Sequence, residues 1–195
     1  MKKVIGITGN SGSGKTTATE ILERLTNGFV IDADKVVKYL SNPGTEYFNA
    51  IKDTFGECFF DEDGNLKRKT LAKEIYENKE SLEKLNNLTF KFVVEEIEKI
   101  IKETEKEIII LDAPLLFESG LDKECTDIIA LVAPFELKVS RIMKRDNLTE
   151  EMASSRINIQ AKDEFYINKA DYIIENLNQD ELEEKIKNVL LNILK

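Results

Sequence analysis

The sequence predicts an α/β fold built on a parallel five-stranded sheet flanked by helices. Short apolar runs, rich in β-branched residues, alternate with segments whose apolar residues recur at helical spacing. The runs are residues 4–7, 29–31, 108–111, 128–132 and 172–174. Such alternation is typical of crossover connections, which place helices on both faces of a parallel sheet. A glycine-rich loop follows the first run, and an unusually long segment separates the second run from the third.

Composition narrows the class of protein. The chain has 195 residues, of which 42% are hydrophobic and 33% charged, as in an ordinary globular protein with one sizeable core. Its net charge of -9 disfavours general binding to nucleic acid or to an anionic membrane. A small anionic substrate in a locally positive cleft fits this charge better. The sequence contains no histidine, so any proton transfer must use carboxylates.

The cysteines and the N-terminal residues indicate an intracellular setting. Cys58 and Cys125 lack the spacing of a metal knuckle or a redox pair, and we expect them to be reduced packing residues. The start Met1-Lys2-Lys3 resembles that of a signal peptide, but the apolar stretch ends within a few residues. No run approaches the length that spans a membrane. We therefore expect a cytoplasmic protein.

The loop after the first run carries the strongest motif. Residues 9–16, Gly-Asn-Ser-Gly-Ser-Gly-Lys-Thr, fit the phosphate-binding pattern G-x-x-x-x-G-K-[ST] at every fixed position. The glycines allow backbone N–H groups to line a concavity that Cβ atoms would obstruct. Lys15 supplies a cation for the outer phosphates of a nucleoside triphosphate, and Thr16 offers a hydroxyl to magnesium. The predicted ATP-binding residues of the loop are Ser11, Gly12, Ser13, Gly14, Lys15, Thr16 and Thr17.

Acidic residues follow the second and third runs, at the sheet edge where ligands of α/β proteins bind. Asp34 can accept a hydrogen bond from an acceptor hydroxyl and orient it in line with the γ-phosphorus. In a loose transition state the nucleophile loses its proton late, so orientation matters more than basicity. Two neighbours have open interpretations: Asp32 can cap the following helix, and Asp112 is either a magnesium-shell carboxylate or a turn former.

A basic helical segment at residues 138–146 offers positive charge for the transition state. Arg141 and Arg145 are i,i+4 neighbours, so one helical face can direct two guanidinium groups at the phosphates. Arg156 lies nearby in a small lid, which we place at about residues 141–163. The alternative interpretation is a solvated basic face.

The segment between the second and third runs, about residues 41–106, is too long for an ordinary crossover. We expect it to form an inserted helical lobe within a single domain that covers residues 1–195. Its apolar residues keep helical spacing, and no internal repeat or linker interrupts it.

Several segments together resemble dephospho-coenzyme A kinases, a family with the P-loop kinase fold. The resemblance extends over nearly the whole chain, and its most specific parts are the Asp-Ala-Asp segment at 32–34 and Pro-Leu-Leu-Phe-Glu at 114–118. The other matching segments are residues 8–17, 42–44, 55–56, 63–68, 141–146, 156–160 and 170–176.

The resemblance implies transfer of the γ-phosphate of ATP, with magnesium, to the ribose 3′-hydroxyl of dephospho-coenzyme A, the last step of coenzyme A synthesis. It gives Asp34 the role of catalytic base and Arg141 that of a lid arginine, with Lys15 as the third catalytic residue. It adds Arg145 and Asn176 to the ATP site, and it implies that the long insertion is the substrate lobe. The implied substrate-binding residues are Thr8, Asp34, Arg68 and Glu118.

The chain departs from the family pattern in the substrate lobe. Lys38 stands where the family often has a histidine, and Asn87-Leu88 stands where it often has a His-Pro pair. These differences bear on details of the acceptor site and leave the phosphate chemistry unchanged.

Two other functions share some of these features. A nucleoside or nucleoside-monophosphate kinase would have the same loop, acidic strand end and lid. A GTP-dependent switch would carry a guanine-reading segment, and residues 168–171 have that spelling. They precede a strand-like run instead of following one, which disfavours the switch.

Overall fold

The computed structural model describes residues 2–195, which divide into two compact units. The first contains the residues up to Asp32 together with Thr104–Lys195, and the second is Ala33–Glu103. Among the described residues, no helix is both long enough and apolar enough to cross a membrane.

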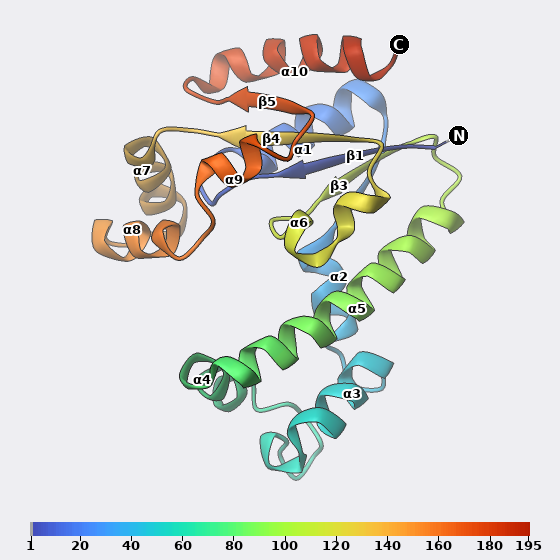
Figure 1. Cartoon of the computed structure of the whole chain (residues 1–195), viewed down its shortest axis with the longest axis vertical. Coiled ribbons are helices and arrows are strands. Elements are labelled where there is room, and N and C mark those ends of the chain that lie inside the picture. Colours follow the sequence, from blue (N-terminus) through green and yellow to red (C-terminus); the bar gives the residue numbers. More distant parts are fainter. Residues whose placement is uncertain (1) are drawn as a thin grey trace. The chain divides into compact units, whose positions relative to one another are not determined.

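The first unit contains the predicted parallel sheet. Its five strands lie in the order β2-β3-β1-β4-β5, and every neighbouring pair is parallel (Figure 1). The strands are β1 (Lys3–Thr8), β2 (Phe29–Asp32), β3 (Ile108–Asp112), β4 (Asp127–Val132) and β5 (Tyr172–Glu175). Each apolar run of the sequence became one strand, so the fold class is confirmed. The first strand lies in the centre, which places the loop that follows it between the ends of β3 and β4.

One face of the sheet is covered by α1 (Lys15–Thr26) and α10 (Gln179–Ile193), which also pack on each other. The core between them and the strands includes Ile5, Ile7, Ile110, Ile129, Leu131 and Ile174. From α10 it takes Leu182, Ile186, Leu190 and Ile193. Leu194, the residue after the end of this helix, is 48% exposed.

The opposite face receives α6 (Leu116–Ser119), the 3₁₀ helix η2 (Leu121–Glu124) and α9 (Asp163–Ile167). Cys125 packs there against Gly6, where an added Cβ would come within 2.7 Å of its sulfur. Burial, with the nearby acids Asp122 and Glu124, raises the pKa of this thiol to about 12. Both cysteines are free, as expected, but only Cys125 is a packing residue because Cys58 is exposed.

Two helices follow β4 and pack on each other: α7 (Phe135–Asp146) and α8 (Glu150–Asn158). Their small core consists of Val139, Ile142, Ala153 and Ile157. The turn between them uses Asn147 in the left-handed region, with φ of 53°, and Thr149 then caps α8 by accepting from Met152 N–H. The chain next forms a short connection and α9, before it enters β5.

The second unit is helical. It contains α2 (Ala33–Leu40), α3 (Glu46–Phe55), the 3₁₀ helix η1 (Glu57–Phe59), α4 (Arg68–Glu77) and α5 (Lys79–Glu103). The long helix α5 packs against α2, α3 and α4. Tyr47 of α3 contacts two residues of α5. Its ring lies 5.7 Å from that of Phe92, and its hydroxyl is 2.7 Å from Thr89 Oγ1. The unit includes α2, which lies before the insertion that we placed at about residues 41–106.

Candidate active site

The phosphate loop, residues 9–14, joins the end of β1 to the start of α1. Gly9 and Gly14 have φ of 133° and 104°, a region that side chains with a Cβ rarely adopt. A Cβ on Gly9 would collide with the carbonyl oxygen of Leu131, and one on Gly14 with Nδ2 of Asn176. We expected Cβ atoms to obstruct the anion cavity, but at these two glycines the collisions are with protein atoms that pack against the loop.

Asn176 holds the loop through its side chain. It lies directly after β5, is only 2% exposed, and its Nδ2 donates to Ser13 O at 2.8 Å. The C=O and N–H groups that flank one peptide bond point in opposite directions. Since the Ser13 carbonyl faces Asn176, the N–H of Gly14 faces away from it. A side chain of the last strand thus sets the direction of one N–H group of the loop.

Arg141, on α7, contacts the same part of the loop. Its Nη1 donates to Gly12 O at 3.2 Å, and its Nη2 donates to Asn176 O at 3.1 Å and Oδ1 at 3.4 Å. Burial lowers the pKa of this guanidinium from its ordinary value, which is so high that the group remains charged. All its hydrogen bonds within the described chain go to carbonyl oxygens, so no carboxylate there neutralises this charge beside the loop.

Lys15 and the start of α1 add further positive potential. Lys15 Nζ donates to Gly9 O at 2.6 Å and to Asn10 O at 3.4 Å, so the side chain lies across the loop. Helix α1 has Gly14 as its N-cap, no capping side chain, and no acidic residue in its first turn. Its first N–H groups and the positive end of its dipole are therefore suited to an anion.

A carboxylate and two hydroxyls lie beside the same helix start. Asp112 ends β3 and pairs in register with Ile7 of the central strand. Its Oδ2 accepts a hydrogen bond from Thr19 Oγ1 at 3.0 Å. Thr16 precedes Thr19 by three residues, so both lie on one side of α1. Oxygen donors of this kind are the ligands that magnesium prefers.

Arg145, unlike Arg141, is directed to a carboxylate. Its Nε lies 2.8 Å from Asp146 Oδ1, and Arg156 binds the other oxygen of the same carboxylate. The hydrogen bond from Arg145, and the positive charges of both arginines, lower the pKa of Asp146 to about 2. Of the two guanidinium groups expected on one helical face, only that of Arg141 contacts the phosphate loop in this structure.

Of the substrate-binding residues implied by the resemblance, two lie in the first unit. Thr8 is fully buried, and its hydroxyl lies 3.4 Å from the carbonyl oxygen of Pro114. Glu118 is exposed on α6. Thr8 therefore supports the connection after β3, whereas Glu118 presents its carboxylate to solvent.

The other two belong to the second unit. Arg68 is the first residue of α4, and its Nη2 donates to Ser41 O at 3.3 Å. Asp34 is exposed in the first turn of α2, two residues beyond the end of β2. Lys38, at the family's histidine position, is exposed on the same helix.

The sequence did not predict a polar network that binds the loop, in which Gln160 and Asp163 contact Ser11 and Asn10. Asn10 Nδ2 donates to Asp163 Oδ1 at 3.0 Å, and Lys138 Nζ contacts both oxygens of that carboxylate, at 2.8 and 2.9 Å. Gln160 binds Ser11 through its side chain. Lys138, expected on a basic surface, is only 4% exposed. The partners lie more than 100 residues from the loop in sequence, so no local pattern indicated them.

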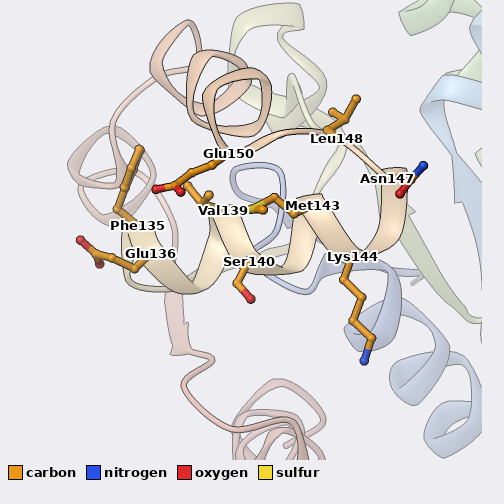
Figure 2. Close-up of a pocket in the computed structure, with 9 residues that line it drawn as sticks. All are labelled: Phe135, Glu136, Val139, Ser140, Met143, Lys144, Asn147, Leu148 and Glu150. Carbon is orange, nitrogen blue, oxygen red and sulfur yellow. The ribbon is translucent and has the colours of Figure 1, made fainter.

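A cavity of about 710 Å³ lies elsewhere, along α7 and the connection to α8 (Figure 2). Val139 and Met143 point from α7 toward the chain segment that carries Leu148 and Glu150. None of the predicted site residues lines this cavity, and we do not place the nucleotide there.

The sheet order and the loop between β1 and α1 define the class: this is a P-loop nucleotide-binding protein with a kinase fold. Comparison with known proteins identifies the family. The model of the dephospho-CoA kinase family matches residues 3–181, so the chain belongs to that family. The predicted recognition and function are thereby confirmed, and the chain is a kinase that uses ATP and a small-molecule acceptor.

Individual relatives agree. A dephospho-CoA kinase of Fusobacterium nucleatum is 39% identical over 187 residues, which cover 95% of this chain and 94% of the relative. Among solved structures, TT1252 from Thermus thermophilus has a TM-score of 0.84 at 28% identity, covering 100% of this chain and 98% of that one. A dephospho-CoA kinase from Campylobacter jejuni has a TM-score of 0.68 at 29% identity, covering 99% and 98%.

The contact between Asn176 and Ser13 leads to a prediction about nucleotide affinity. We expect Asn176→Ala to weaken binding of ATP by about tenfold, because a buried carbonyl loses its donor and the loop loses its orientation. Calorimetric titration with a non-hydrolysable ATP analogue measures this. Asn178→Ala is the matched control: it removes the N-cap of α10, which costs about 1 kcal/mol of stability, and leaves affinity unchanged. Equal affinities of the two variants would contradict the role of Asn176.

Proposed function

We propose that this protein transfers the γ-phosphate of ATP to the ribose 3′-hydroxyl of dephospho-coenzyme A, the last step of coenzyme A synthesis. Family membership supports the choice of acceptor. The observation that carries the chemistry is the Arg141 guanidinium, which bonds only carbonyl oxygens beside the loop at an uncapped helix start. In a chain of net charge -9, this local positive site favours a polyanion.

We assign the binding of the triphosphate to residues 11–17, through their side chains and those of their backbone N–H groups that face the anion. Lys15 would leave the carbonyl oxygens of Gly9 and Asn10 and bind the outer phosphates as a mobile cation. Arg141 stabilises the charge that develops on the transferring group, since its other bonds keep it beside the loop. Two predicted ATP-binding residues remain. Asn176 would act indirectly, through its hydrogen bond to the Ser13 carbonyl of the loop. Arg145 would need to leave Asp146 to reach the nucleotide.

We assign magnesium to Thr16 and Asp112. The oxygen donors beside the start of α1 fit this ion, and the bond to Thr19 holds the carboxylate on that side of the helix. When bound, magnesium would neutralise charge on the β- and γ-phosphates.

Asp34 is the proposed base. It is an exposed carboxylate that lies two positions beyond the end of β2, the edge of the sheet where α/β proteins bind ligands. Its role is to accept the hydrogen bond of the 3′-hydroxyl and to hold that oxygen in line with the γ-phosphorus.

The function is tested by measuring turnover of ATP with dephospho-coenzyme A, with nucleosides and with nucleoside monophosphates, each with magnesium and with EDTA. We expect activity with dephospho-coenzyme A alone, abolished by EDTA. Activity on a nucleoside or nucleotide without activity on dephospho-coenzyme A would replace this proposal by another small-molecule kinase. A strong preference for GTP over ATP in binding would favour a switch.

Replacing the proposed base should separate binding from chemistry. We expect Asp34→Asn to keep ATP affinity and to lower kcat by about two orders of magnitude, because the amide cannot accept the proton. Steady-state kinetics together with a nucleotide titration measure both quantities. Asp53→Asn, on an exposed turn of α3, serves as the control in the same unit. An unchanged kcat would remove Asp34 from the mechanism.

The two arginines of α7 should differ in their effect on turnover. We expect Arg141→Ala to lower kcat by about 10²–10³-fold, the usual loss for a donor that stabilises transition-state charge. Arg145→Ala should lower it by less than about tenfold, because its charge is shared with Asp146. Parallel kinetics of both variants provide the comparison. A larger loss for Arg145→Ala would mean that Arg145 turns to the phosphates during the reaction.

A further inference from the structure

Gln160 binds the phosphate loop at one residue. It lies between α8 and α9, where its own N–H donates to Ile157 O at 3.0 Å and so fixes the start of the side chain. Its Oε1 accepts from Ser11 N–H at 3.0 Å, and its Nε2 lies 3.3 Å from Ser11 Oγ. Since a backbone N–H can only donate, the carboxamide oxygen must face Ser11 N–H, which settles the orientation of the amide.

The bonded N–H belongs to the peptide between Asn10 and Ser11. In that peptide the carbonyl of Asn10 points opposite to the N–H of Ser11. On its side the Asn10 carbonyl accepts from Ser13 N–H at 3.1 Å and from Lys15 Nζ at 3.4 Å. Gln160 therefore binds the N–H side of this peptide, and Lys15 binds its carbonyl side.

The neighbouring contacts support the same orientation. Asn10 Nδ2 donates to Ala161 O at 3.0 Å and to Asp163 Oδ1 at 3.0 Å. Lys138 is 4% exposed and binds that carboxylate at 2.8 Å, so the α8–α9 connection is anchored to α7. Gln160, which accepts the hydrogen bond from Ser11 N–H, therefore belongs to a segment that is anchored to the loop and to α7.

We propose that Gln160 is a positioning residue for nucleotide binding, which acts through the Asn10–Ser11 peptide. By occupying Ser11 N–H it fixes the orientation of this peptide before the nucleotide binds, and it removes Ser11 N–H from the donors that meet phosphate. The proposal rests on the proposed use of ATP and not on the identity of the acceptor.

The predicted effect follows from losing one hydrogen-bond pair. Gln160→Met keeps the length and volume of the side chain but can neither accept from Ser11 N–H nor donate to its hydroxyl. We expect it to raise the Kd for a non-hydrolysable ATP analogue about tenfold. The KM for the acceptor should change by no more than about twofold, since Gln160 acts on the nucleotide loop alone.

The conservative variant tests whether the effect runs through Ser11. A carboxylate can accept both from Ser11 N–H and from its hydroxyl. Gln160→Glu is therefore expected to keep Ser11 N–H protected from hydrogen exchange in the free protein, whereas Gln160→Met should expose it. Ile159→Ala is the control, because the neighbouring side chain is 84% exposed and should leave both affinity and exchange unchanged.

The experiment combines calorimetry with site-resolved amide exchange of the three variants, each compared at equal folded fraction. Weaker nucleotide binding together with faster exchange at Ser11 in Gln160→Met, and retained protection in Gln160→Glu, would support the proposal. Wild-type affinity in Gln160→Met, or Ser11 exchange that does not respond to it, would overturn it. Neither measurement needs an acceptor, so failure of dephospho-coenzyme A as substrate would be seen separately, in the turnover assay.

Discussion

The hydrogen bonds between loop carbonyls and side chains from the C-terminal half of the chain are the interaction on which the site depends. A loop that turns N–H groups toward an anion must turn carbonyl groups elsewhere, and buried carbonyls need donors. Asn176 donates to the carbonyl of Ser13, and Arg141 donates to that of Gly12. The motif itself contains neither residue, so the loop obtains its shape from β5 and α7 as much as from its glycines.

Carboxylate placement decides which cations remain available to a polyanion. Arg145 and Arg156 share Asp146, and Lys138 is neutralised by Asp163. Arg141 bonds only to carbonyl oxygens, so its charge is held beside the loop without an acidic partner in the described chain. A protein with a net charge of -9 can in this way present one positive locus. To judge whether a helix can bind a polyanion, the partner of each basic side chain is therefore more informative than the number of basic residues.

The residues proposed for the reaction are divided between the two units. The loop, Arg141 and Asp112 belong to the sheet unit, whereas Asp34 lies in the first turn of α2, in the helical unit. Helix α2 begins at Ala33, directly after β2 ends at Asp32, so Asp34 lies two positions beyond the strand.

The sequence by itself determined the sheet, the loop and the family, because each depends on local pattern: strands on runs of β-branched residues, the loop on glycine spacing. It could not determine which side chains contact the loop, since Asn176, Gln160 and Asp163 lie about 150 residues away and only folding brings them there. Helical spacing placed Arg141 and Arg145 on one face, but Arg145 binds Asp146, the next residue in the chain, whereas Arg141 binds Gly12 and Asn176, which only folding brings to it. Local periodicity is set by backbone geometry, whereas partnership is set by packing between distant segments.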